Sequence, residues 1–296
     1  MHYTAETLLI KSRDTGETGV FAEVRPEQAG WQLLNMQARR LKRGETWAGA
    51  TGEHEMVHVI LGGVCRIRSS AGEWPRVGRR PDVFRGMPYA VYLSRHTQFE
   101  LEALTDGFEV ATCWVPTDQD HPARLITPAD CTIELRGGGN ASRQIVSVIP
   151  PGFDCHRLVC VEVYTPGGNW SSYPPHKHDV HRVAPDGTLL EADLEEIYFY
   201  KIDRPGGYAI QRVYNDDRRI DALLLAQHHD AVLVPEGYHP VVSPPGYTTY
   251  YLNFLAGSAQ SLANSDDPAY AWVKSTWTHL DPRLPIVDLG MEPPQR

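Results

Sequence analysis

Short runs of bulky apolar residues, many of them alternating with polar residues, recur along the whole chain. In the first half they cover 31–41, 57–68, 89–94, 98–104 and 108–116. In the second half they cover 157–165, 195–202, 208–214, 221–226, 230–237 and 248–257. Alternation places every second side chain on the same face of a strand. Many short strands separated by turn residues are typical of an all-β sandwich or barrel.

A helix is predicted only near the C-terminus, after Gly257 and over 267–277, where Trp272 and Trp277 lie near helical spacing and could pack across a barrel. The stretch 116–142 differs in composition and contains three consecutive glycines, so we interpret it as a connection between two halves.

Each half of the chain has the same order of strands, a turn rich in glycine and proline, and further strands. This order predicts a duplicated β-barrel fold. We expect one barrel over residues 1–130 and a second over 131–296.

The composition excludes several classes of protein. A net charge of −9 without a basic tract argues against partners such as nucleic acid or an anionic membrane. No stretch approaches the roughly 20 apolar residues of a membrane span, and the first residues do not have the pattern of a secretory signal. The five cysteines form no C-x-x-C pair, which favours reduced thiols in a cytoplasmic protein.

The strongest local motif is the pair His176 and His178, which follows two prolines. Two histidines at i and i+2 on a strand point to the same face, so inside a barrel both imidazoles would face the lumen. Two neutral imidazoles side by side are a natural first half of a metal site. An isolated H-x-H motif also occurs in surface loops, so further ligands are needed to support this interpretation.

Two later segments supply such ligands. In 195–200, alternation places Glu196, Tyr198 and Tyr200 on one face of a strand and Glu195 on the other. A tight proline-glycine turn over 234–238 then delivers His239 at the start of the next strand.

The metal ligands predicted from these segments are His176, His178, Glu196 and His239. Such a nitrogen and oxygen set suits one divalent ion (Mn, Fe, Co, Ni or Zn) with positions left for water or substrate. The absence of thiolate ligands argues against a closed structural zinc site.

This order of histidines, acid and turn resembles the cupin metal motifs. The separation between His178 and the acid is wider than in the common pattern, which leaves Glu195 as the alternative ligand. The turn is one residue tighter than the common form.

Four longer segments are similar to the 5-deoxy-glucuronate isomerase family: 139–151, 161–179, 194–202 and 232–257. The resemblance implies an enzyme of bacterial myo-inositol breakdown whose chain folds into two cupin barrels. It also implies an aldose–ketose isomerisation between 5-deoxy-D-glucuronate and 5-dehydro-2-deoxy-D-gluconate. The related ketol-isomerases of 4-deoxy-5-hexosulose-uronate share this plan and are the nearest alternative.

Isomerisation of this kind requires a base that removes the proton from the hydroxyl-bearing carbon. The metal would bind the carbonyl and hydroxyl oxygens and stabilise the enediolate as a Lewis acid. Tyr198 and Tyr200 share the inward face with Glu196 and are the candidates for proton handling. Glu195 is a candidate only if the alternation breaks. The carboxylate of a small sugar-acid substrate requires a cation, and the candidates are Arg143, Arg182, Lys201 and Arg212.

The first half carries His54, Glu55, His58 and His96, whose spacing does not reproduce the H-x-H pattern. We expect this barrel to hold no metal and to serve packing or assembly. Edge strands and two barrels favour a homo-oligomer. Alternative functions are a metal-dependent cupin dioxygenase, which would consume oxygen, and a non-catalytic sugar-binding cupin, which would show no turnover.

Overall fold

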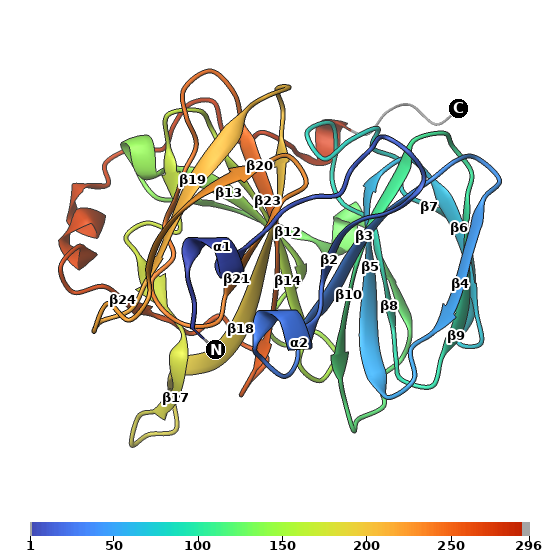
Figure 1. Cartoon of the computed structure of the whole chain (residues 1–296), viewed down its shortest axis with the longest axis horizontal. Coiled ribbons are helices and arrows are strands. Elements are labelled where there is room, and N and C mark those ends of the chain that lie inside the picture. The colour runs from blue at the N-terminus through green and yellow to red at the C-terminus, as the bar shows by residue number, and fades with distance from the viewer. Residues whose placement is uncertain (1, 292–296) are drawn as a thin grey trace.

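A computed structural model describes residues 2–291, and its regular secondary structure is almost wholly β-strand (Figure 1). The strands form two barrels that lie side by side, the first in blue to green and the second mainly in yellow to orange. The predicted all-β fold of two cupin barrels is confirmed. All five cysteines are free. Within residues 2–291, no helix is long and apolar enough to span a membrane.

The first barrel contains two antiparallel sheets. Its strands are β2 (Gly19–Val24), β3 (Asn35–Leu41), β4 (Thr46–Ala50), β5 (His54–Gly62), β6 (Cys65–Ser69), β7 (Gly72–Val77), β8 (Ala90–Leu93), β9 (Gln98–Ala103), β10 (Phe108–Pro116) and β11 (Arg124–Ile126). The larger sheet has the order β11-β8-β5-β10-β3-β2 and the smaller one has the order β4-β9-β6-β7.

The second barrel repeats this plan. Its strands are β12 (Thr132–Arg136), β13 (Arg143–Ile149), β14 (Val159–Thr165), β15 (Trp170–Ser171), β16 (His176–Lys177), β17 (Asp179–Val183), β18 (Leu189–Ile202), β19 (Tyr208–Tyr214), β20 (Asp221–Gln227), β21 (Ala231–Val234), β22 (Val241–Val242), β23 (Thr249–Gly257) and β24 (Ser265–Asp266). β1 (Leu9–Ile10) is added from the start of the chain and pairs with β21. The large sheet runs β1-β21-β18-β23-β14-β13-β12, with β17 on β18. The smaller sheets are β15-β22-β19-β20 and β16-β24.

The helices are short. They are α1 (Ala5–Leu8), α2 (Pro26–Ala29) and the 3₁₀ turns η1 (Pro128–Asp130), η2 (Gly139–Ala141), η3 (Ala271–Thr276) and η4 (Leu289–Met291). The helix predicted over 267–277 is wrong in type and extent, because only η3 forms there, and none forms directly after Gly257. The hydroxyls of Ser275 and Thr276 bond carbonyls three residues back, which competes with a regular α-helix. Trp272 is 63% exposed and does not pack across the barrel.

The connection predicted over 116–142 is also wrong in extent. β11 and β12 both lie within it, and only η1 separates them. β11 pairs with β8 of the first barrel, whereas β12 pairs with β13 of the second. The glycines that suggested a flexible connection instead lie at the turn between β12 and β13.

β5 shows why several strands look apolar on both faces. Val57, Val59 and Leu61 belong to the core shared with the second barrel. Met56 and Ile60, on the opposite face, belong to the interior of the first barrel. A strand with one face in a barrel and the other in an interface is buried throughout, so it lacks an apolar-polar alternation.

Two buried or half-buried glutamates fasten the barrels together in a reciprocal way. The Glu55 carboxylate, on β5, accepts hydrogen bonds of 2.6–3.0 Å from the backbone N–H groups of 156–158 in the second barrel. The Glu195 carboxylate, on β18, accepts bonds of 2.7–3.1 Å from the N–H groups of 32–34 in the first barrel. Each carboxylate satisfies three backbone donors that the interface would otherwise leave without partners.

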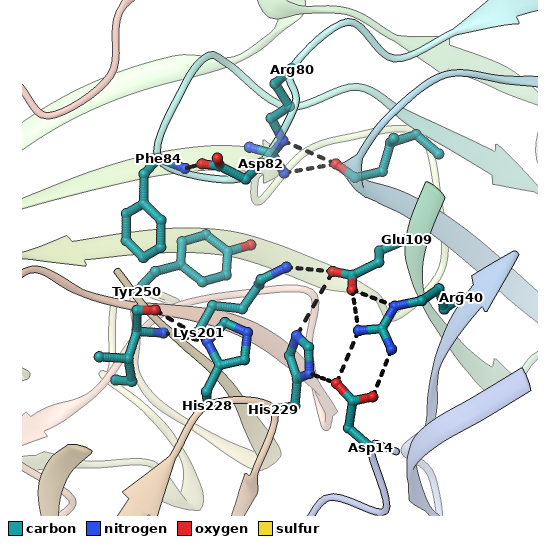
Figure 2. Close-up of polar contacts among 12 residues, drawn as sticks. Asp14, Arg40, Arg80, Asp82, Phe84, Glu109, Lys201, His228, His229 and Tyr250 are labelled. Carbon is teal, nitrogen blue, oxygen red and sulfur yellow. Dashed lines mark hydrogen bonds and ion pairs between the residues drawn. The ribbon is translucent and has the colours of Figure 1, made fainter. Parts of the chain in front are cut away.

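A chain of charged side chains crosses the same interface (Figure 2). Lys201 on β18 donates to Glu109 on β10, which also accepts from Arg40 at 2.6 and 3.0 Å. Arg40 in turn donates to Asp14, and Asp14 lies 2.7 Å from Nδ1 of His229. Lys201 is 5% exposed and Glu109 9% exposed, so removal of the Glu109 carboxylate would leave the buried ammonium of Lys201 without its bonded partner.

The Glu109→Gln variant should therefore unfold more easily than the wild type at pH 7, by about 3 kcal/mol or more. Burial opposes ionisation of Glu109, but Lys201, His229 and Arg40 outweigh it and lower the pKa to about 2. A carboxyl whose pKa falls on folding stabilises the fold above its unfolded pKa of about 4.3, and this contribution is lost as the pH falls towards 2.

Urea unfolding measured at several pH values checks this. The difference between the variant and the wild type should shrink between about pH 4.5 and 2. A difference that stays constant over that range would show that Glu109 does not stabilise the interface through its charge.

Candidate metal centre and pocket

Three predicted metal ligands meet inside the second barrel. His178 follows β16, Glu196 lies on β18, and His239 follows the turn after β21. The ligand atoms of these three residues all lie within 4.8 Å of one another, and all three side chains are buried. Oε2 of Glu196 is 2.9 Å from Nε2 of His178 and 3.3 Å from Nε2 of His239.

The protonation of the two histidines fits a bound cation. Nδ1 of His178 lies 3.0 Å from the Leu194 carbonyl oxygen, and Nδ1 of His239 lies 2.8 Å from that of Gly237. A carbonyl only accepts, so each Nδ1 carries a proton and each ring turns its Nε2 towards Glu196. Lone pairs that face a carboxylate repel it unless a cation lies between them. A carbonyl that fixes the far nitrogen is also the usual support of a metal-binding histidine.

The pKa values agree with this arrangement. Burial lowers the pKa of His239 and of His176 to about 3, so both are neutral ligands at ordinary pH. Burial also opposes a charge on His178, but the hydrogen bond to Glu196 outweighs it and raises the pKa of His178.

His176 lies beside this group without belonging to it. Its ring is 4.8 Å from the ring of His239, nearly perpendicular to it, and it lines the same pocket as His178 and Glu196. The structure therefore brings three of the four predicted ligands together and places the fourth next to them.

These side chains open into a pocket of about 170 Å³ inside the barrel. Tyr198 lines it, with its hydroxyl 3.0 Å from Oγ of Ser172, and burial raises the pKa of Tyr198 well above 10. Tyr200 lies deeper. Its hydroxyl donates to Gln211, whose amide donates to the His239 carbonyl. Tyr200 thus supports the segment that carries His239 and does not line the pocket.

Arg143 is the predicted substrate cation that does line the pocket. It is 4% exposed and donates to the carbonyls of Ala141 and Tyr173. No carboxylate within residues 2–291 forms an ion pair with it, and burial lowers its pKa to about 10. Burying a guanidinium without a counter-ion costs free energy. A buried cation in this state is expected where the site binds an anionic ligand.

The structure places the other predicted residues elsewhere. Glu195 faces the first barrel, as the alternation of its strand indicates, so it is neither an alternative ligand nor near the pocket. Lys201 is committed to Glu109 in the interface. Arg212 pairs with Asp221 on the outer surface, and the exposed Arg182 bonds Ser265. None of the four lines the pocket.

Several lining residues were not predicted from the sequence. Tyr251 and Asn253 lie on β23, where the alternation of 249–257 would have placed them on one face. Glu134 and Arg136 lie on β12, within the segment that was interpreted as a connection. Their carboxylate and guanidinium are paired at 2.6 and 2.7 Å.

Comparison with known proteins agrees with this geometry. Residues 8–273 match the model of the KduI/IolB family. The chain belongs to the KduI/IolB family. It is 42% identical over 267 residues to a 5-deoxy-glucuronate isomerase of Geobacillus kaustophilus, covering 90% of this chain and 95% of that protein. It is 36% identical to the Bacillus subtilis (strain 168) protein of the same name over 253 residues, covering 85% and 91% of the two chains. The chain is accordingly an isomerase of this family.

Solved structures show the same fold. An IolB-like protein from Salmonella typhimurium superimposes with a TM-score of 0.84 at 36% identity, covering 90% of this chain and 98% of that one. The Bacillus subtilis oxalate decarboxylase superimposes with a TM-score of 0.60 at 13% identity, covering 89% and 78%. The second likeness supports the two-barrel cupin fold alone.

The adjacent glutamates of β18 give a matched test of the metal centre. Glu196→Gln removes the shared carboxylate charge and should lower the bound divalent metal by at least tenfold, as measured by elemental analysis after dialysis against a metal buffer. Glu195→Gln should retain the metal, because its side chain faces the other barrel, but it should unfold at a lower temperature. Full metal content in Glu196→Gln would exclude this residue as a ligand.

Proposed function

We propose that this isomerase converts 5-deoxy-D-glucuronate to 5-dehydro-2-deoxy-D-gluconate in inositol catabolism, with the help of one divalent metal ion. The observation that carries the proposal is the buried Arg143, without a carboxylate partner within residues 2–291, on the same pocket as His178 and Glu196 of the candidate metal centre. The substrate has an anionic end and a reactive carbonyl end, and the pocket offers one partner for each. The names of the relatives support this substrate.

His178, Glu196 and His239 would hold the ion, with His176 as a fourth ligand. When bound, a divalent ion would act as a Lewis acid that polarises the substrate carbonyl and stabilises the negative charge of an enediolate. Imidazole and carboxylate ligands suit Mn, Fe, Co, Ni or Zn.

Arg143 fixes the other end of the substrate. A guanidinium binds a carboxylate through two parallel hydrogen bonds, so it sets orientation as well as position. Apolar side chains of the pocket, such as Val161, Val163 and Leu255, limit the water around the bound acid. A fixed orientation brings the hydroxyl-bearing carbon and the carbonyl carbon to the same place in each turnover.

The reaction moves a proton between two neighbouring carbons, so one group must accept it and return it. Tyr198 suits hydrogen-bond donation to a substrate oxygen, because its raised pKa keeps the phenol protonated. Glu134 suits the basic role, because the hydrogen bonds from Arg136 lower its pKa and keep it ionised. It is the lining carboxylate that remains when Glu196 is counted as a ligand.

Two alternatives predict different products. A ketol-isomerase of 4-deoxy-5-hexosulose-uronate would use the same pocket, because that substrate is also a deoxy-uronate. A metal-dependent dioxygenase would consume oxygen, whereas isomerisation conserves every atom and electron of the substrate. Assembly as a homo-oligomer remains a prediction.

Incubation of the purified protein with 5-deoxy-D-glucuronate should yield the keto acid without oxygen uptake, as followed by NMR and an oxygen electrode. A strong chelator should abolish turnover, and a divalent ion should restore it. Faster conversion of 4-deoxy-5-hexosulose-uronate would assign the chain to the alternative substrate. Oxygen consumption in step with turnover would exclude an isomerase.

Arg143→Gln should raise KM for the acid at least tenfold, because the carboxylate loses a charge-assisted, two-bond partner. Arg212→Gln, which breaks only the surface pair with Asp221, is the matched control and should leave KM unchanged. An unchanged KM in Arg143→Gln would show that another group binds the carboxylate.

A further inference from the structure

The first barrel has a hollow of its own at its mouth. The hollow has a cavity volume of about 500 Å³ and lies between the two sheets of the barrel, within the size range of small-molecule sites. Its lining combines arginines with aromatic rings: Arg25, Arg39, Trp47, Phe99 and Trp114.

This hollow corresponds to the metal pocket of the second barrel. β5 lies between β8 and β10 in its sheet, as β18 lies between β21 and β23. The two strands can be aligned through Glu55 and Glu195, which make reciprocal bonds across the interface. Met56 then occupies the place of Glu196, and it lines the hollow. The Met56 thioether is a poor ligand for a hard divalent ion, so this hollow lacks the carboxylate of the metal-ligand set. We therefore expect it to bind a molecule other than a metal ion.

A buried imidazole below the hollow has one nitrogen without a partner. His58 lies on the same face of β5 as Met56 and is fully buried, against the rings of Trp47 and Phe99. Its Nδ1 lies 2.9 Å from the Thr112 hydroxyl, but its Nε2 has no hydrogen-bond partner. An unpaired polar atom at such a depth is rare in native proteins and calls for a missing ligand or water.

Arg39 is the second cation of the hollow, and the carboxylate that acts on it through space, Glu23, is bonded to Arg25. Its guanidinium stacks over the Trp47 ring at 4.7 Å, donates to Gln37 at 3.2 Å, and leaves a buried Nε without a partner. The neighbouring Arg25 is neutralised by Glu23 through bonds of 2.7 and 3.0 Å. Within residues 2–291, Arg39 forms no ion pair with a carboxylate. Stacking on the indole fixes the plane of the guanidinium, and its in-plane N–H groups remain available to an anion.

We propose that the mouth of the first barrel is a second, non-catalytic binding site for a sugar acid with one carboxylate. Arg39 binds the carboxylate, and the indole and phenyl rings of Trp47, Trp114 and Phe99 contact the C–H face of the sugar. One guanidinium without a bonded carboxylate, on a lining that also carries Glu53, favours a monocarboxylate over the more highly charged phosphate esters and diacids.

Calorimetric titration of the whole chain with D-glucuronate tests this site. Two sites per chain are expected in the wild type, one in each barrel. Arg39→Gln should weaken one of them at least tenfold and leave kcat unchanged. D-glucose, which lacks the carboxylate, should not bind to the first barrel. Arg68→Gln, which alters an exposed pair with Glu100 in the same barrel, is the matched control and should bind like the wild type.

The Arg143→Gln variant separates this proposal from the proposed catalytic function, because it should weaken only the site in the second barrel. Ala50→Trp, at an exposed position on the lining of the hollow, should block the first-barrel site without replacing a buried residue. It serves as the test if Arg39→Gln does not fold. One site per chain in the wild type, equal binding of D-glucose, or full two-site binding in a folded Arg39→Gln or Ala50→Trp variant would each overturn the proposal.

Discussion

The side-chain alternation along β18 is the constraint on which the structure depends. Glu196 points into the barrel, where it meets two imidazoles, and Glu195 points out, where it holds three backbone N–H groups of the other barrel. Because the period of a strand is two residues, a shift of one residue would exchange these roles. The candidate metal centre and the interface are therefore fixed by the same register, and the pairing of β18 with both β21 and β23 secures it.

Much of this could be predicted from the sequence, because it follows from local period. Alternation was enough to separate Glu196 from Glu195, and the H-x-H motif and the proline-glycine turn identified His178 and His239. Which of the candidate cations lines the pocket could not be predicted in this way, because it depends on contacts between residues far apart in the sequence. Lys201 shares a strand with Glu196, yet its partner Glu109 lies in the other barrel, and no sequence pattern indicates a pair so distant along the chain.

The prediction that 116–142 is a connection was wrong for a different reason. The prolines and glycines of this segment lie between short strands at the boundary of the two barrels. Short strands that alternate with turn residues have the same composition as a loop, so composition does not distinguish the two. β12 was missed in this way, and Glu134 and Arg136 were missed with it. Arg143 was found, but its special state, a buried charge without a carboxylate partner, is visible only once the surrounding side chains are in place.

The two barrels share an architecture but differ in what their interiors demand of a ligand. The second barrel gathers two imidazoles around a carboxylate, a set that suits a metal ion, and Arg143 lines the same pocket. The corresponding place in the first barrel has Met56 in place of the carboxylate, and Arg39 lines the same hollow. Both pockets hold an arginine suited to an acid, but within residues 2–291 only the second has a carboxylate among imidazoles that suits a metal ion. Divergence between duplicated barrels can thus proceed by replacing the carboxylate of the metal-ligand set while an arginine for an acid is kept, together with the strands and the reciprocal Glu55 and Glu195 contacts.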